Sequence, residues 1–366
     1  MPSPSFIRNV PAALLLFAAG CASKIPLAQT PVSQSALDAF LAKGRDARYY
    51  GITTYQDPGG ARFESANRPH TGQIAQLDVV SPTSWPLPVV EAHSALSKAD
   101  FPILMDSSAR QSWATMQSAE SMEYRPFAPP TGEYADHVVS EIPGYAGVGN
   151  KLVFDALHVE YPVFCVPPAS GGLGPLARLP KRPDAPPSKR AAPAMELAER
   201  MPAVAGAALM RSFSFVRFDF PARRVQLCVS EPYRPVSSNA VLACLRLDNW
   251  RGRPAVQAVL GGKPTTLVID TAGDFELSLP SADGAEGPLL LGRLSIDDIR
   301  IDAHAALGLP EKFPARLGVR LLSRYAVTLD FKQQRVWFEG APLADDAPDA
   351  GSGETDKPIQ YRGITP

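Results

Sequence analysis

Two apolar segments of the chain each end in an aspartate, and the pattern around them predicts β-strands. In residues 265–280 (TTLVIDTAGDFELSLP) a β-branched run leads directly into Asp270, and residues 101–105 lead in the same way into Asp106. Residues 87–93 precede the latter segment with strand-like character, so the two are expected to pair as a hairpin whose second strand is apolar on both faces. Because strands dominate the pattern, the chain is expected to be all-β with short helices.

The same pattern occurs twice, which indicates an internal repeat. PILMDSSARQSWATM around Asp106 matches TLVIDTAGDFELSLP around Asp270, since in both an apolar run leads to an aspartate, a hydroxyl residue and two small residues. A second match joins FVRFDFPARRVQL to AVTLDFKQQRVWF at a constant offset of 111 positions, as from Asp219 to Asp330. A repeat of this size means two similar supersecondary units in one chain.

The two aspartate segments resemble the active-site segments of aspartic proteases of the pepsin and retropepsin type, in which a buried strand delivers an Asp-Thr/Ser-Gly turn. Each repeat also contains an apolar-Gly element, ending at Gly206 and Gly318. In that family this element crosses beneath the aspartate turn, where a side chain would collide with neighbouring backbone. On these motifs the chain is identified as a member of the bilobal pepsin/retropepsin-like aspartic protease family, as a bacterial aspartyl protease-like lipoprotein. The resemblance implies two pseudo-symmetric pepsin/retropepsin-like lobes.

The resemblance further implies that Asp106 and Asp270 form a catalytic dyad. Two carboxylates in one site cannot both ionise, so the pair would share one proton and hold one water. The ionised member would take a proton from this water, and the protonated member would donate to the peptide carbonyl. Ser107 and Thr271 would supply hydroxyls that interlock beneath the carboxylates. We therefore expect a monomeric aspartic endopeptidase that acts on a peptide or protein substrate and needs no metal or cofactor.

The sequence departs from the family pattern at the third position of each turn, where Ser108 and Ala272 replace glycine. A Cβ at this position would strain the turn by about 1 kcal/mol or more if φ is positive. In addition, Arg110 could bring a cation close enough to lock the Asp106 carboxylate in its ionised form. The alternative is therefore a catalytically inactive protein that uses the fold as a peptide-binding or protein-binding module. A one-lobe protease that dimerises is a third interpretation, which the internal repeat disfavours.

The first repeat is longer than the second and has room for a flap. Tyr124, Tyr134 and Tyr145 lie in a segment that is suitable for a hairpin closing over a cleft. Residues 169–200 are rich in proline, glycine, alanine and basic residues and are interpreted as a mobile insertion. The expected division of the chain is a tether with a short helix at 22–49, lobe one at 50–230, lobe two at 241–340 and a disordered tail at 341–366.

The first 21 residues resemble a bacterial lipoprotein signal peptide. Arg8 gives a weakly positive start, residues 10–19 are apolar but too short to span a bilayer, and Ala18-Ala19-Gly20-Cys21 closes the segment. The resemblance implies lipidation of Cys21, and because Ala22 rather than aspartate follows, it implies the periplasmic face of the outer membrane of a Gram-negative-type bacterium. An ordinary secretory signal with a chance cysteine is the alternative.

Composition narrows the remaining classes of function. The 366 residues carry a formal net charge of −1, which argues against a nucleic-acid partner. The five histidines are scattered, and neither a His-Glu-x-x-His motif nor a Gly-x-Ser-x-Gly motif occurs, so a zinc protease or serine hydrolase is not expected. In an oxidising periplasm, Cys228 with Cys244 or Cys165 with Cys228 is a candidate disulfide.

Overall fold

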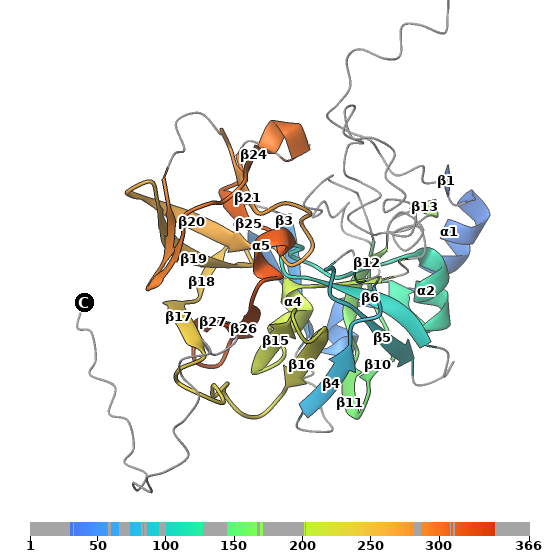
Figure 1. The fold of residues 1–366 in the computed structure, drawn as a ribbon. Coiled ribbons are helices and arrows are strands. Elements are labelled where there is room, and N and C mark those ends of the chain that lie inside the picture. The colour runs from blue at the N-terminus through green and yellow to red at the C-terminus, as the bar shows by residue number, and fades with distance from the viewer. Residues whose placement is uncertain are drawn as a thin grey trace, which may run out of the picture.

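The computed structural model describes residues 30–340 except 32, 58–59, 66–73, 82, 84–85, 95–99, 127–144, 167–168, 171–200, 202, 282–286, 308 and 310–311. The predicted leader with Cys21, most of the predicted insertion, Tyr134 and the C-terminal tail lie outside the described residues. Within them, strands dominate (Figure 1). None of the helices in these ranges is long and apolar enough to cross a membrane.

The first half of the chain forms a nine-stranded sheet with Asp106 at the end of an inner strand. Strand β5 (Val89–Ser94) pairs antiparallel with β6 (Asp100–Asp106), which confirms the predicted hairpin. Strand β14 (Ala203–Gly206) runs parallel to β6, and its other edge pairs with β7 (Trp113–Ala114). The remaining strands of this sheet are β8 (Arg125–Pro126), β9 (Tyr145–Val148), β10 (Lys151–Phe154), β11 (Leu157–Glu160) and β12 (Val163–Val166).

The second half repeats this arrangement in an eight-stranded sheet. Strand β20 (Lys263–Ile269) leads into Asp270, β25 (Ala315–Leu317) runs parallel to it, and β21 (Leu277–Leu279) pairs with the other edge of β25. The same strand, turn and crossing strand therefore carry each aspartate. The remaining strands are β18 (Asp248–Trp250), β19 (Arg253–Leu260), β22 (Leu289–Leu291), β23 (Leu294–Ile296) and β24 (Ile301–Ala303).

A six-stranded sheet joins the two halves at the centre of the molecule (Figure 1). Its two middle strands are β15 (Phe215–Asp219) and β26 (Ala326–Asp330), which pair antiparallel with Arg217 opposite Thr328. Arg217 and Thr328 are themselves 111 positions apart, so a pseudo-two-fold axis passes through this pair and relates the halves. The outer strands are β4 (Ile74–Asp78), β16 (Arg224–Cys228), β17 (Val241–Arg246) and β27 (Arg335–Glu339).

Short helices complete the fold. Helix α1 (Gln34–Leu41) lies in the segment 22–49, for which a short helix is predicted, and the Ser33 side chain caps it by accepting a hydrogen bond from the Ala36 N–H at 3.3 Å. Helices α4 (Ala207–Met210) and α5 (Val319–Leu322) follow Gly206 and Gly318 in equivalent places. The predicted fold class, all-β with short helices and two pseudo-symmetric lobes, is confirmed. The other elements are α2 (Met116–Ser121), 3₁₀ turns at Ala47–Tyr50 and His304–Leu307, and the strand pairs β1 (Thr30–Pro31) with β13 (Ala169–Ser170) and β2 (Ile52–Asp57) with β3 (Gly60–Ser65).

The predicted disulfides do not form, since no disulfide joins any two of Cys165, Cys228 and Cys244. Cys228 lies on β16 and Cys244 on β17, and strands β15, β26 and β27 separate those two in the central sheet. At about 4.8 Å per strand spacing their backbones are about 19 Å apart, far beyond the roughly 7 Å that a disulfide can span. Cys165 lies in the nine-stranded sheet, opposite Trp113.

Candidate functional site

Asp106 and Asp270 meet where the two halves of the molecule join. Each follows or ends an equivalent strand, β6 or β20, and both side chains are buried, with exposed fractions of 3% and 1%. Their neighbours hydrogen-bond across the pseudo-two-fold axis, and the two carboxyl groups are near enough to influence each other's ionisation. The structure thus brings together the two aspartates that the repeat singled out.

Ser107 and Thr271 interlock beneath the aspartates. The Ser107 N–H donates to Thr271 Oγ1 at 2.9 Å, and the Thr271 N–H donates to Ser107 Oγ at 3.2 Å. Each hydroxyl then donates to the carbonyl that precedes the opposite aspartate, Ser107 Oγ to Ile269 and Thr271 Oγ1 to Met105, both at 2.6 Å. Four buried hydrogen bonds therefore fix the two turns relative to each other, in the arrangement expected of these hydroxyls.

Ser108 and Ala272 fit their turns without the strain that the missing glycines suggested. Neither residue has a positive φ, so the Cβ costs no left-handed backbone conformation. Ser108 instead adds a contact, because its Oγ donates to Asp106 Oδ1 at 2.6 Å beside the N–H groups of Ser108 (2.9 Å) and Ala109 (3.1 Å). In the other turn the Ala272 N–H donates to Asp270 Oδ1 at 3.2 Å.

A buried arginine on β25 contacts the dyad. Arg316 is 2% exposed and pairs with Oδ2 of Asp270. Its Cζ atom lies 5.6 Å from the centroid of the Phe275 ring. The sequence pointed instead to Arg110, which is buried but contacts neither carboxylate among the described residues. A signal for Arg316 was present, because it is charged where the first repeat has Val204, two residues before the glycine.

Burial and charge together set the ionisation of the site. Burial, followed by the nearby Asp270 charge, raises the pKa of the Asp106 carboxyl, although hydrogen bonds from Ser108 and the charge of Arg316 act in the opposite direction. Burial lowers the pKa of the Arg316 guanidinium, which the two aspartates oppose. Because arginine stays protonated in proteins, the site holds a permanent cation beside two carboxyl groups.

Replacing Asp106 with asparagine is expected to cost less stability at about pH 7 than at about pH 3. Folding raises the pKa of Asp106, so the stabilisation that this group provides is complete below its unfolded pKa of about 3.9 and is lost as pH rises through the folded value. Asparagine cannot ionise and escapes this loss. Urea unfolding of the wild type and the variant at both pH values measures the difference, and an equal cost at both would contradict it.

Among the predicted flap residues, Tyr124 is the one whose side chain the structure describes. Tyr124 is 2% exposed and packs edge-on against Phe164 at a centroid distance of 5.4 Å, so its side chain lies in the core of the first half. Strands β8 and β9 pair antiparallel, and Tyr145 begins β9. The flap role of Tyr145, and of Tyr134 outside the described residues, stays a prediction.

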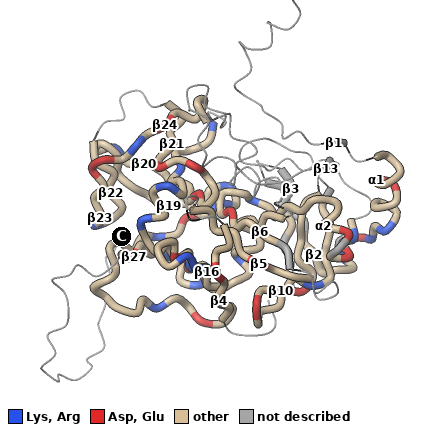
Figure 2. The backbone as a smooth tube through the Cα atoms, turned by 45° about the vertical axis from the view of Figure 1, so that its right-hand side comes forward, with Lys and Arg blue, Asp and Glu red and all other residues tan. Residues whose placement is uncertain are grey.

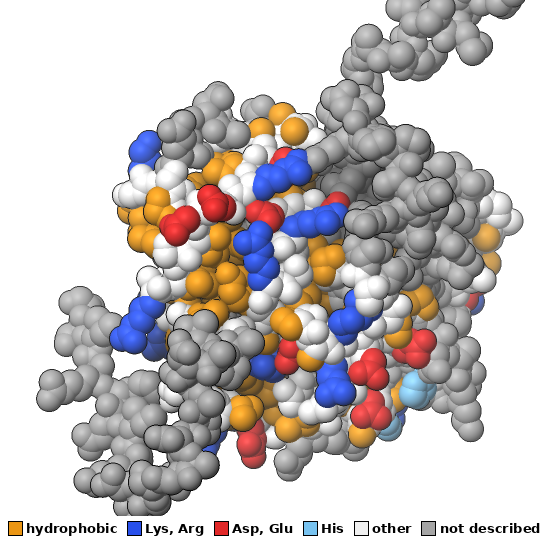
Figure 3. Space-filling view, viewed as in Figure 1, with side chains coloured by type: hydrophobic (Ala, Val, Ile, Leu, Met, Phe, Trp, Pro, Cys, Tyr) orange, Lys and Arg blue, Asp and Glu red, His pale blue; other side chains and the backbone are white. Residues whose placement is uncertain are grey.

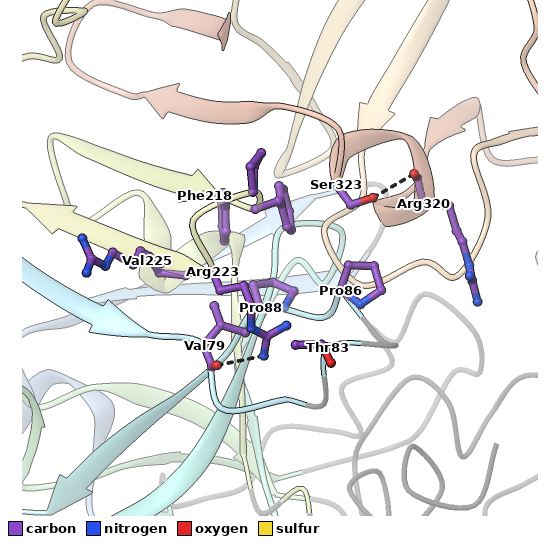
Figure 4. Close-up of a pocket in the computed structure, with 12 residues that line it drawn as sticks. Val79, Thr83, Pro86, Pro88, Phe218, Arg223, Val225, Arg320 and Ser323 are labelled. Atoms are coloured by element: carbon purple, nitrogen blue, oxygen red, sulfur yellow. Dashed lines mark hydrogen bonds between the residues drawn. The ribbon is translucent and has the colours of Figure 1, made fainter. Parts of the chain in front are cut away.

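Other surface features of the described residues lie away from the dyad. A groove of about 450 Å³ runs between the β4–β5 connection, the β15–β16 turn and α5, and no dyad residue lines it (Figure 4). Charges of both signs are spread over both halves (Figure 2). On the face that Figure 3 shows, charged side chains are interspersed with hydrophobic ones. Nowhere in the described ranges do three His, Cys, Asp or Glu side chains gather in a way that could hold a metal ion.

Comparison with known proteins corrects the family assignment. No family model matches the chain, and no curated protein matches it. Among solved structures it is similar to soybean basic 7S globulin, with 11% identity over 75% of this chain and 96% of that chain, and a TM-score of 0.45. The assignment to the aspartic protease family as a bacterial aspartyl protease-like lipoprotein is therefore wrong. A similarity this distant carries no argument about function, and the fold class rests on the strands themselves.

Proposed function

We propose that the protein is an aspartic-type endopeptidase in which Asp106 and Asp270 activate one water molecule. The observation that supports this proposal is the interlocked pair of Ser107 and Thr271, which fixes the turns of two buried carboxyl groups close enough to influence each other's ionisation. Catalysis loses roughly 100-fold from a misplacement on the order of 1 Å, so a fixed geometry of this kind is what acid–base chemistry requires.

The reaction needs one proton shared by the pair. The ionised carboxylate removes a proton from the water as the oxygen attacks the peptide carbonyl, and the protonated carboxyl donates to the carbonyl oxygen. The pKa of Asp106 is raised. The dyad is therefore favoured to keep one proton at pH values above the ordinary pKa range of an aspartate. Burial also strengthens the electrostatic interactions of the site with the developing charge.

A second candidate function is non-catalytic binding of a peptide or protein. The observation that favours it is the ion pair of Arg316 with Asp270, because a guanidinium on one carboxylate oxygen occupies an acceptor that a catalytic water would use. For either function, the leader sequence supports the further proposal that a lipid on Cys21 anchors the protein as a monomer at the periplasmic face of the outer membrane.

Peptide cleavage separates the two candidates. We expect protein that starts after Cys21 to cleave a mixed peptide library between about pH 3 and pH 7, with inhibition by a pepstatin-type compound. Asp270→Asn is expected to lower the rate about 100-fold to 10,000-fold, the range that one acid–base group contributes.

The matched control is Asp274→Asn, since Asp274 lies four residues away and pairs with Arg320 rather than with the dyad. This control should keep wild-type activity. A demonstrably folded wild-type protein that cleaves nothing at any pH would contradict the endopeptidase proposal and favour the binding function.

A further inference from the structure

The two halves of the site differ at one pair of buried positions. Val204 on β14 and Arg316 on β25 are equivalent, because each lies two residues before the glycine that passes beneath an aspartate turn. The sizes of their cross-strand neighbours differ in the opposite direction. The smaller Val204 lies opposite the large Trp113 on β7, whereas the larger Arg316 lies opposite the small Ser278 on β21. The small serine leaves room where the first half holds a tryptophan. Space for the arginine is therefore built into the second half.

In the part of the chain that the structure describes, β25, β6 and β19 each bring a charged group near Asp270 or its partner Arg316. Arg316 on β25 pairs with Oδ2 of Asp270, Asp106 at the end of β6 lies near enough for the two carboxyl groups to interact electrostatically, and Arg253 on β19 lies close enough to Arg316 to affect its ionisation. Arg253 is 5% exposed and donates from Nε to the Ser108 carbonyl at 2.7 Å, which ties it to the Asp106 turn. Asp270 is thus the carboxylate that contacts a cation directly.

Asp106 has a different set of partners. Within the described ranges its carboxyl group accepts three hydrogen bonds, all at Oδ1, from neutral donors of its own turn: the Ser108 hydroxyl and the N–H groups of Ser108 and Ala109. A direct guanidinium contact stabilises a carboxylate more than a neutral hydrogen bond does. The two aspartates are therefore inequivalent despite the symmetry of their strands.

We propose that Arg316 is a positioning residue that holds Asp270 ionised, so that the single proton of the dyad resides on Asp106. The location of the proton is inferred from the contacts of the two carboxyl groups alone. Its role in catalysis rests on the proposed function. Asp270 would then be the base that takes the proton from water, and Asp106 the acid that donates to the carbonyl oxygen.

Infrared titration of the protonated carboxyl band tests this assignment without reference to activity. Difference spectra against Asp106→Asn and Asp270→Asn isolate the dyad from the other carboxyl groups. At neutral pH we expect the wild type to show one protonated dyad carboxyl, which Asp106→Asn removes. On acidification, Arg316→Met should take up the second proton at a pH about one to three units higher than the wild type.

Three further variants make the result specific to the charge. Arg316→Gln keeps a donor toward Asp270 without the charge and is expected to shift in the same direction, so it carries the test if Arg316→Met does not fold. Arg316→Lys keeps the charge and should restore most of the wild-type behaviour. Arg110→Met removes another buried arginine, one without a described contact to either carboxylate, and should leave the titration unchanged.

An identical titration in the wild type, Arg316→Met and Arg316→Gln would overturn the inference. The proposed function has a separate readout, since the acidic limb of the pH–rate profile for peptide cleavage should move together with the infrared titration. A protein that shows the infrared shift and cleaves no peptide would contradict the endopeptidase proposal while supporting the role of Arg316.

Discussion

Alanine at Gly318 is expected to lower the free energy of unfolding by about 3 kcal/mol or more, and alanine at Gly206 by a similar amount. A Cβ built on either glycine would lie 2.2 Å from a backbone carbonyl oxygen, that of Phe275 for Gly318 and that of Gln111 for Gly206. Backbone cannot rotate away as a side chain can. The added methyl group must therefore displace the strand that supports an aspartate turn.

The displacement would also break hydrogen bonds of the crossing. The Gly318 N–H donates to the Glu276 carbonyl at 2.8 Å, and in the first half the Ala207 N–H donates to the Ala109 carbonyl at 2.7 Å. Both bonds are buried in the turn region, so their loss leaves polar groups without partners.

Chemical unfolding of the purified variants measures this effect, with Gly340→Ala as the control. A Cβ at Gly340 would come within 2.8 Å of a terminal methyl of Leu242, which can rotate aside. Gly340→Ala should therefore cost much less than either crossing glycine. Similar small losses for all three variants would show that the crossing tolerates a side chain.

Breaking the buried ion pair from either side is expected to cost about 3–5 kcal/mol, because each single variant leaves an uncompensated buried charge. Arg316→Met strands the Asp270 carboxylate, and Asp270→Asn strands the Arg316 guanidinium, with side chains that are 1% and 2% exposed. The double variant removes both charges, so its loss should be well below the sum of the single losses.

A double-mutant cycle in urea measures this coupling. The exposed pair of Arg224 with Asp78, at 3.5 Å, is the control and should give a coupling energy below about 1 kcal/mol. Additive losses at Arg316 and Asp270 would mean that the two charges do not stabilise each other in the folded protein, and would remove the basis of the asymmetric dyad.

The strands and turns of the site could be predicted because their signals are local. A continuous apolar run predicts a strand that is apolar on both faces, and the aspartate at its end predicts the turn. In the first repeat this run includes Ile103, Leu104 and Met105, all of which are fully buried. The repeat then located the second turn. It also located Gly206 and Gly318, since each precedes the equivalent strand of its repeat, by nine residues before Phe215 and by eight before Ala326.

The role of Arg316 could not be predicted because it depends on long-range pairing. Within its own strand it only interrupts an apolar run, and its contacts become visible when β21 brings Ser278 opposite and β20 brings Asp270 alongside. The cysteine pairing failed for the same kind of reason. An oxidising periplasm favours a disulfide, but the order of strands in the central sheet decides whether Cys228 and Cys244 lie close enough to form one.

The central pairing of β15 with β26 has a consequence for how the protein is made. When β15 has been synthesised, its partner is still missing, and the ribosome must add 111 residues between Asp219 and Asp330 before that partner is complete. At about 5–20 residues per second this interval lasts about 6–22 s. Throughout it, β15 presents an open edge that another nascent chain could pair with. Expression at high density, where growing chains lie close together on one messenger RNA, should therefore favour association through this edge over correct closure of the sheet.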